Sequence, residues 1–474
     1  MLYLKTKRQF QKTILGLSLL VLMAACTTHY PINNSIISTA AVERFSIRDK
    51  HHSRSDELLL ILAFSGGGTR AAAFSYGVLQ TLAETHIVID GKKRRLLDEV
   101  DGISSVSGGS FTAAYYGLFK DRIFEEFETK FLKYNVQSEL IGRVFSPFNW
   151  PRLASHYFER SDLAAEYYDE LLFEKKTFQD FMTAKSPLIA INATNVAMGS
   201  QFTFIGEEFA PICSDLSSFP VSRAVTASSA VPGAFSSIIL KNYAGTCNYR
   251  LPEWAAKALD ERQVNTRRYH TAKILSDYQD TTVQPYIHLL DGGISDNLGI
   301  RLIINLTHAG GGIWNKLKQF DLEKTSKMAL IIVNAQKAID TSFTKRDYSM
   351  PIIDTLGAAS SIPLDKFTFE TMEIVRNNST RWQESITAGR CGEATPSKNS
   401  RQAGTSGATP ACAAQTYLIE VNFDRLQDET ERNHLKHLPT SFYLEPGDVD
   451  RLKAAAKKIL ADSAEFKKLF GDLQ

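Results

Sequence analysis

The chain has 474 residues, of which 43% are hydrophobic and 10% aromatic, so it carries enough apolar material for a large folded core and is not a disordered chain. Its 54 lysine and arginine residues are nearly balanced by 52 acidic residues, and the formal net charge is +2. No long basic run follows the N-terminal segment, so the sequence gives no indication of nucleic-acid binding.

The first 25 residues have the composition of an export signal rather than of a folded domain. Four positive charges precede a twelve-residue apolar stretch, Ile14 to Ala25. This stretch is too short to span a bilayer, because spanning takes about 20 apolar residues. It ends in Leu22-Met23-Ala24-Ala25-Cys26, which resembles a bacterial lipoprotein signal with Met23 in place of the usual leucine. We expect residues 1–25 to be a lipoprotein signal peptide and Cys26 to be lipidated; the alternative is an ordinary secretory signal with an unmodified Cys26.

Cleavage before Cys26 removes four positive charges and lowers the formal net charge from +2 to −2. Acyl chains on Cys26 would then anchor the protein in the bacterial cell envelope, because more than one chain gives stable attachment. Thr27, where an aspartate would retain a lipoprotein in the inner membrane, favours the outer membrane, with the protein facing the periplasm. Residues 26–55 lack sustained apolar periodicity, which predicts a flexible tether.

From Asp56 onward, short apolar runs alternate with helical segments, as in an α/β fold whose sheet is covered by helices on both faces. The predicted strands are 58–64, 100–106, 188–193, 286–290, 328–333 and 417–421. The predicted helices include 71–82, 111–119 and a terminal amphipathic pair over 448–470. We expect residues 56–310 to form the main core, with a C-terminal α/β extension, residues 311–474, packed on it.

Residues 120–185 depart from this alternation. Apolar residues recur at helical spacing among charged ones, and Phe145, Phe148 and Trp150 then cluster between two prolines. Two interpretations remain open for this segment. It forms helices packed on the core, or it forms an apolar lid or membrane-facing rim that would suit a lipid substrate.

Four cysteines remain if Cys26 carries lipid, and an oxidising periplasm permits disulfides between them. Sequence order allows three ways of pairing them. Cys213 with Cys247 and Cys391 with Cys412 is the favoured pairing, because each bond closes a local loop. The alternative is four free or buried thiols.

Ser107 is the candidate nucleophile. Its predicted strand ends at Val106, glycines follow at 108 and 109, and a helix begins at once, so the hydroxyl would stand on a sharp strand-to-helix turn. A serine in this position is also a common helix cap. Ser104, Ser105 and Ser110 are rival nucleophiles, but none combines the strand end with a following glycine pair.

The triplet Gly66-Gly67-Gly68 follows another predicted strand and is a candidate oxyanion hole, because glycine N–H groups can point into one concavity. It lacks the spacing of a nucleotide-binding loop. Arg70, two residues further on, is a candidate for binding a lipid phosphate, and pinning the loop is its other possible role.

Asp291 is the candidate base, at the end of a predicted strand and followed by two glycines. His288 lies three residues earlier and would face the other side of the strand, so no histidine suits a triad. Asp296, with Asn297, is interpreted as turn and capping chemistry, and as the alternative base.

Three of these blocks, Gly66-Gly67-Gly68-x-Arg70, Ser107-Gly108-Gly109 and Asp291-Gly292-Gly293, resemble the signature blocks of the patatin-like phospholipase family. The block Ala227-Ser228-Ser229-Ala230-Val231-Pro232-Gly233 and the run Ala193-Thr194-Asn195 are similar too. The resemblance covers roughly residues 56–305. Ser105 departs from it, standing where the family's G-x-S-x-G has its first glycine.

The resemblance implies a three-layer α/β/α fold with a mostly parallel central sheet, in which residues 56–310 are the catalytic core. It also implies a Ser-Asp dyad of Ser107 as nucleophile and Asp291 as base, with Gly66, Gly67 and Gly68 as the oxyanion hole and no metal or other cofactor. The expected activity is that of a membrane-tethered lipid acyl hydrolase, of phospholipase A or lysophospholipase type, acting on lipid acyl esters. The alternatives are an acyltransferase with the same dyad and a non-catalytic lipoprotein that binds lipid or a partner protein.

Overall fold

The computed structural model describes residues 31–37, 54–183, 186–261, 266–338, 342–345, 347, 349, 352–393 and 412–474. The predicted signal peptide and Cys26 lie outside these residues. So does most of the loop between Cys391 and Cys412.

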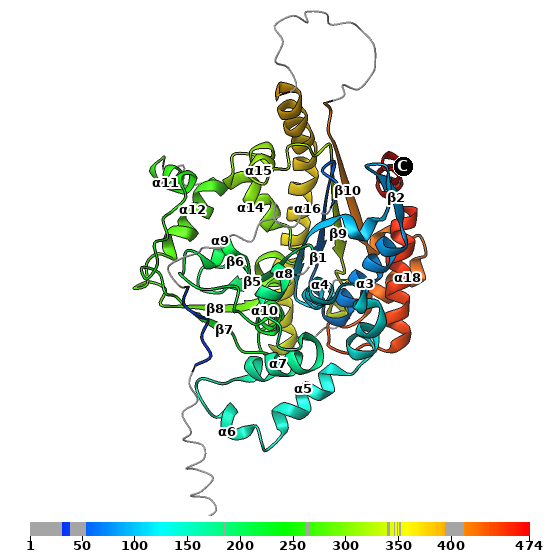
Figure 1. The fold of residues 1–474 in the computed structure, drawn as a ribbon. Helices are drawn as coiled ribbons and strands as arrows, with labels where there is room; N and C mark the ends of the chain where they lie inside the picture. Colours follow the sequence, from blue (N-terminus) through cyan, green and yellow to red (C-terminus); the bar gives the residue numbers. More distant parts are fainter. Residues whose placement is uncertain are drawn as a thin grey trace, which may run out of the picture.

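The centre of the molecule is one eight-stranded, mostly parallel sheet (Figure 1). Along it the strand order is β10-β9-β1-β4-β5-β8-β7, and β6 pairs with β5. Neighbours from β10 to β5 run parallel, while β6, β7 and β8 add antiparallel pairings at one side. The strands are β1 (Leu58–Phe64), β4 (Val100–Val106), β5 (Leu188–Asn195), β6 (Ser200–Thr203), β7 (Ile238–Lys241), β8 (Tyr286–Asp291), β9 (Lys327–Asn334) and β10 (Gln415–Asn422).

Helices cover both faces of the sheet, because β1 and its neighbours are apolar on both sides. In β1, Leu60 and Phe64 point into the core under α3 (Gly68–Glu84), α4 (Gly108–Phe119) and α18 (Pro446–Asp462). The alternate residues, such as Ile61, pack under α14 (Arg301–Ala309), α15 (Ile313–Gln319) and α16 (Ile352–Glu393). The result is the expected three-layer α/β/α architecture (Figure 1).

Residues 120–183 are helical, as expected, and include irregular turns. This part holds η2 (Lys120–Arg122), the π-helical η3 (Ile123–Leu132), α5 (Val136–Phe145), α6 (Trp150–Leu153), α7 (Arg160–Tyr168), η4 (Asp169–Phe173) and α8 (Phe178–Thr183). The remaining elements are β2 (His86–Ile89), β3 (Lys92–Arg95), η1 (Leu96–Glu99), α9 (Gly206–Phe209), α10 (Val221–Ser228), α11 (Glu253–Asp260), α12 (Arg267–Asp277), α13 (Gly293–Asp296), η5 (Ser342–Lys345), η6 (Phe423–Arg425), α17 (Glu429–His437) and α19 (Ala464–Asp472). None of the helices described is long and apolar enough to cross a membrane.

The predicted C-terminal extension contributes strands to the central sheet as well as outer helices. β9 pairs with β1 over seven residues, from Leu58 with Lys327 to Phe64 with Val333, and β10 pairs with β9. All six predicted strands are present, and the predicted helices correspond to α3, α4, α18 and α19. The 42-residue helix α16 was not predicted; it carries a proline at position 363.

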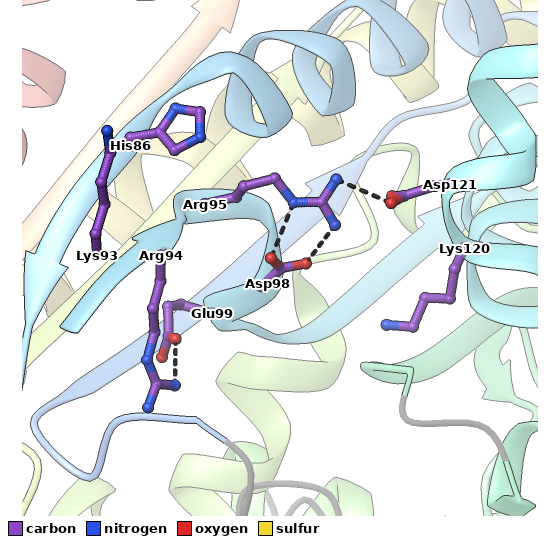
Figure 2. Close-up of a pocket in the computed structure, with 8 residues that line it drawn as sticks. All are labelled: His86, Lys93, Arg94, Arg95, Asp98, Glu99, Lys120 and Asp121. Carbon is purple, nitrogen blue, oxygen red and sulfur yellow. Dashed lines mark hydrogen bonds and ion pairs between the residues drawn. The ribbon is translucent and has the colours of Figure 1, made fainter.

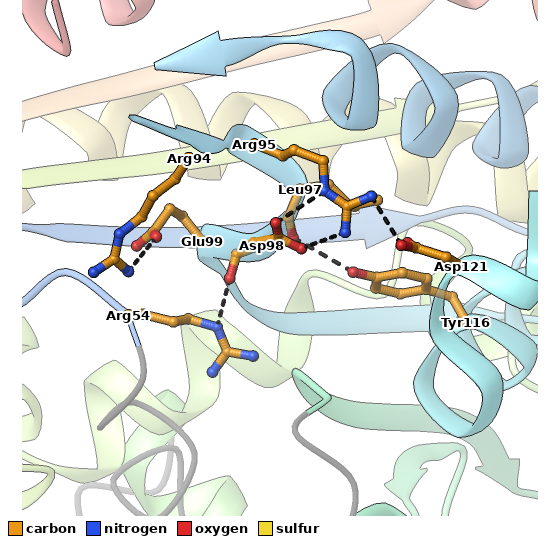
Figure 3. A network of polar contacts seen from close by, with 8 residues as sticks. All are labelled: Arg54, Arg94, Arg95, Leu97, Asp98, Glu99, Tyr116 and Asp121. Atoms are coloured by element: carbon orange, nitrogen blue, oxygen red, sulfur yellow. Dashed lines mark hydrogen bonds and ion pairs between the residues drawn. The ribbon is translucent and has the colours of Figure 1, made fainter. Parts of the chain in front are cut away.

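The structure differs from the predicted tether at residues 31–37, which are bound to the core. The side chain of Asn34 donates to Ser214 Oγ (2.6 Å) and accepts from the N–H of Lys241 (2.7 Å). At the other end of the predicted tether, Arg54 Nε donates to the carbonyl of Asp98 (3.2 Å). Figure 3 shows this contact within a network of charged side chains on β3, η1 and η2. Polar side chains therefore attach a segment that has no apolar periodicity.

Two disulfides join the pairs favoured from the sequence. Cys213 is bonded to Cys247, and Cys391 to Cys412. The first bond ties the loop after α9 to the loop after β7, and the second ties the end of α16 to the start of β10. Each closes a loop within the chain and so lowers the entropy of the unfolded state.

Candidate active site

Ser107 occupies a strained turn between β4 and α4. Its φ and ψ are 49° and −121°, a conformation that non-glycine residues rarely adopt and that is typical of a nucleophile elbow. Gly108 makes the turn possible, because a Cβ there would clash with the backbone of Gly68. At Gly109 an added Cβ would lie 2.7 Å from the carbonyl oxygen of Ser65. The small residues after Ser107 thus let the elbow pack directly against the glycine triplet.

Ser228, at the end of α10, holds the elbow in place. Its Oγ accepts from the N–H of Ser107 (2.8 Å) and donates to the carbonyl of Asn192 on β5 (2.6 Å). Its own carbonyl accepts from the N–H of Gly292 (3.1 Å), next to Asp291. The block that contains Ser228 can be recognised in the sequence, but its role cannot, because the partners of Ser228 lie far away along the chain.

Asp291 ends β8 and lies beside the elbow. Its backbone pairs with Ala193 of β5, and β5 in turn pairs with β4. The N–H of Gly293 donates to Asp291 Oδ1 (2.8 Å), and the Ser107 hydroxyl also forms a hydrogen bond with this carboxylate. Burial raises the pKa of Asp291 to about 6, and these two hydrogen bonds act in the opposite direction. The structure therefore brings the predicted nucleophile and base together.

The alternative bases lie elsewhere. His288 is exposed on the other face of β8, with Nδ1 3.2 Å from Ser237 Oγ, as the alternation of side chains predicts. Asp296 accepts from the N–H groups of Arg301 (2.7 Å) and Leu298 (3.2 Å). It thus performs the turn and capping role expected from the sequence.

The rival serines are also bonded elsewhere. Ser104 Oγ donates to the carbonyl of Gly299 (2.5 Å), and Ser105 Oγ donates to that of Ala190 (3.3 Å). Ser110 Oγ lies between Ser105 Oγ (3.1 Å) and Ser228 Oγ (3.0 Å). Ser105 is accordingly accommodated in place of the expected glycine, because its hydroxyl finds two partners inside the core.

In the glycine triplet, Gly66 differs from the prediction. Its N–H already donates to the carbonyl of Asn297 (3.0 Å), so it is not available as an oxyanion-hole donor. Glycine is needed there for space, since an added Cβ would lie 2.6 Å from Asn297 Oδ1 and 3.3 Å from Ser107 Cβ. Gly67 and Gly68 have φ of +140° and +59°, and within the described ranges their N–H groups have no acceptor. They start helix α3, so its dipole adds to their attraction for a negative oxygen.

Arg70 pins the loop and does not face a substrate, so its assignment as a candidate for substrate binding is wrong. The guanidinium is buried, and Nε donates to the carbonyl of Ala335 (2.8 Å). Nη1 donates to the carbonyl of Leu438, and Nη2 to Thr440 Oγ1 (3.2 Å). Burial lowers the pKa of Arg70 to about 10, which leaves it charged at neutral pH.

A pocket of about 700 Å³ lies away from the serine, between the β2–β3 hairpin and η2 (Figure 2). Its lining residues are His86, Lys93, Arg94, Arg95, Asp98, Glu99, Lys120 and Asp121. Arg95 bridges Asp98 (2.8 Å) and Asp121 (2.9 Å), and Arg94 pairs with Glu99 (2.8 Å). No serine or cysteine is among the lining residues, so this pocket supplies no nucleophile for acyl transfer.

Comparison with known proteins agrees with this geometry. A family model described as patatin-like phospholipase matches residues 62–304, just over half of the chain, and the chain therefore belongs to the patatin-like phospholipase family. No match was found among curated proteins.

The solved structures that match include those of human GIVD cytosolic phospholipase A2. One is 12% identical, with a TM-score of 0.44, over 88% of this chain and 62% of that chain. A second, in complex with methyl gamma-linolenyl fluorophosphonate, is 12% identical, with a TM-score of 0.40, over 90% and 62%. The chain thus spans less than two thirds of the length of these proteins.

Proposed function

We propose that the protein is a membrane-tethered lipid acyl hydrolase that works through a Ser107–Asp291 dyad and an acyl-serine intermediate. The observation that carries the proposal is the Ser107 hydroxyl on a strained elbow, hydrogen-bonded to the buried carboxylate of Asp291. With a pKa of about 6, Asp291 is ionised at neutral pH and still basic enough to take a proton.

In the first half-reaction, Ser107 Oγ attacks the ester carbonyl carbon while its proton passes to Asp291. The carbonyl oxygen becomes negative and is stabilised by the N–H groups of Gly67 and Gly68. The C–O bond of the ester then breaks, and the leaving alcohol takes the proton from Asp291. The acyl group stays on Ser107.

In the second half-reaction, water attacks the acyl-serine carbonyl and gives its proton to Asp291. The bond to Ser107 Oγ breaks, Ser107 recovers the proton, and the fatty acid leaves. An alcohol acceptor in place of water would make the same dyad an acyltransferase, so the products decide between the two reactions.

The test is a set of single substitutions assayed on a chromogenic ester and on phospholipid. We expect Ser107→Ala and Asp291→Asn each to lower turnover by at least about a thousandfold. His288→Ala and Asp296→Asn are matched controls and should keep most of it. An organophosphonate probe should label Ser107 in the wild-type chain; labelling of another residue, or activity that survives Ser107→Ala, would disprove the nucleophile assignment.

The tether rests on the lipoprotein-like run that ends at Cys26 and on Thr27. We propose attachment to the outer membrane, with the protein facing the periplasm. Fatty-acid labelling of the full chain should be lost in Cys26→Ala. Labelling that persists in this variant would exclude Cys26 as the lipid attachment site.

A further inference from the structure

Five large apolar side chains on and after α5 are exposed to solvent. Their exposed fractions are 51% for Ile141, 71% for Phe145, 91% for Phe148, 57% for Trp150 and 52% for Tyr157. We call these five residues the α5–α6 surface. Single exposed apolar residues are common, but a cluster that includes four aromatic side chains on adjacent elements marks an interaction site.

The α5–α6 surface is held on a defined support. Val136 and Leu140 are buried, and Ile141 and Phe145 lie four residues apart on the exposed side of the same helix. Two arginines tie α5 and α6 to α7 and η4. Arg143 lies over the Tyr167 ring (4.4 Å to the centroid) and pairs with Glu170 (2.7 Å).

Arg152 makes the equivalent contacts from α6. It lies over the Phe158 ring (3.8 Å to the centroid) and pairs with Glu166 of α7. These contacts hold α5 and α6, which carry the exposed aromatic side chains, against α7 and η4. Such a preformed apolar surface loses little conformational entropy when it is covered.

The N-terminal end of the described chain lies near the same support. The carbonyl of Ile32 accepts from Arg223 Nη2 (3.5 Å), and Arg223 pairs with Asp162 of α7 (2.7 Å). In Figure 1 the dark blue segment 31–37 and helix α6 both lie in the lower part of the view. Cys26 is five residues before Pro31, so covalent geometry limits their separation to roughly 18 Å. A lipid on Cys26 would bring a bilayer to this end of the molecule.

Helix α5 also contacts the segment that packs on the glycine loop. Gln137 Oε1 accepts from the N–H of Phe442 (3.2 Å), and the neighbouring carbonyl of Ser441 accepts from the N–H of Thr69 (2.9 Å). Thr69 directly follows the glycine triplet. The α5–α6 surface is therefore joined, through one helix and one short segment, to the site where the ester carbonyl would bind.

We propose that the α5–α6 surface seats on a phospholipid bilayer, with its aromatic side chains at the boundary between headgroups and acyl chains. Aromatic residues favour this boundary because their apolar bodies leave water there. The proposal rests on the proposed function, since a bilayer is both anchor and substrate. Between residues 136 and 158 the charged side chains are Glu139, Arg143 and Arg152, and both arginines are already paired. Apolar insertion rather than attraction to anionic lipid therefore drives docking.

The first test uses Trp150 as a probe in the full chain, reconstituted into phosphatidylcholine vesicles whose acyl chains carry bromine. Bromine quenches tryptophan only in close contact, and the chain has four tryptophans, so Trp150→Phe supplies the background. We expect quenching in the wild-type chain that is largely lost in Trp150→Phe, and that changes less than about twofold on raising the salt concentration. Equal quenching in both chains would overturn the proposal and leave the surface to a protein partner.

The second test compares turnover on vesicles with turnover on a monomeric ester. Two phenylalanines leaving water correspond to a change in partitioning of roughly 100-fold or more. The double change Phe145→Ser and Phe148→Ser should lower the vesicle-to-monomer ratio by at least about tenfold. Val88→Ser is the matched control, since Val88 is also exposed but lies on β2, far from α6 in Figure 1.

An unchanged ratio in the double variant would refute docking through these side chains. Quenching does not require turnover, so a chain that shows Trp150 quenching but hydrolyses no lipid would overturn the proposed function and leave the docking surface standing. A chain that hydrolyses lipid without Trp150 quenching would refute docking through the α5–α6 surface and leave the proposed function standing.

Discussion

Replacing Asp291 with asparagine should abolish turnover and, at neutral pH, raise the free energy of unfolding. Asparagine has nearly the same shape and keeps an oxygen that can accept from the N–H of Gly293. It carries no charge, however, and cannot take the proton of Ser107. The substitution thus removes the proposed base and also a buried negative charge.

The size of the stability gain follows from the pKa of Asp291, which burial raises from 3.8 to about 6. Above pH 6 this carboxyl is ionised in both the folded and the unfolded chain, and the folded chain bears the cost of the buried charge. Below pH 3.8 it is protonated in both states and the cost is absent. A shift of about two units corresponds to roughly 3 kcal/mol at neutral pH. The gain should therefore grow as the pH rises from 4 to 7.

Urea unfolding followed by tryptophan fluorescence, with the disulfides intact, measures this gain at several pH values. We expect Asp291→Asn and the wild type to unfold at similar urea concentrations near pH 4, and the variant to need more urea at pH 7.5. Wild-type kcat/KM should fall as the pH drops below about 6, as the base becomes protonated. A variant that is no more stable at pH 7.5, or whose gain is the same at every pH, would refute the argument from a buried charge.

Three further substitutions test the rest of the site. Ser228→Ala removes the acceptor of the Ser107 N–H and should lower kcat by roughly 10- to 100-fold with little change in KM. Ser229→Ala is the control, because the Ser229 hydroxyl donates to carbonyls of α10. Equal losses in the two variants would contradict the positioning role of Ser228. In Gly68→Ala the new Cβ would clash with the carbonyl of Ser441 at a φ of +59°, which strains a residue with a side chain, so turnover should fall at least about a hundredfold. Gly142→Ala, in open space on α5, is the control and should change turnover little. Arg70→Met should lower the free energy of unfolding by about 3 kcal/mol or more, because it leaves the buried carbonyls of Ala335 and Leu438 without a hydrogen-bond donor. A shift in lipid headgroup preference without lost stability would instead return Arg70 to substrate binding.

The features that the sequence predicted well are those encoded locally. A continuous apolar run predicts β1, and a serine between a strand end and two glycines predicts the elbow at Ser107. Asp291 could be chosen over His288 because side chains alternate along a strand. In each case the signal lies within about ten residues, which is the range over which pattern and propensity act.

The features that were missed depend on contacts between distant residues. The partners of Arg70 lie at positions 335, 438 and 440, and the acceptor for the Gly66 N–H lies at 297. Ser228 contacts residues at 107, 192 and 292. No local pattern contains these pairings.

Helix α16 was missed for a different reason. It is mostly polar, with few residues facing the core, and its proline at position 363 argues against a long helix.

The place of β9 in the sheet bears on when the glycine loop can form during folding. The N–H of Ser65, just before the glycine triplet, donates to the carbonyl of Val333, and the N–H of Thr69 donates to Ser441. The glycine loop therefore cannot take its final form until the chain up to Ser441, about nine tenths of its length, is available to fold. Ser107 and Asp291 both come before Val333 and Ser441 in the chain, so the glycine loop is the last part of the candidate site to be completed.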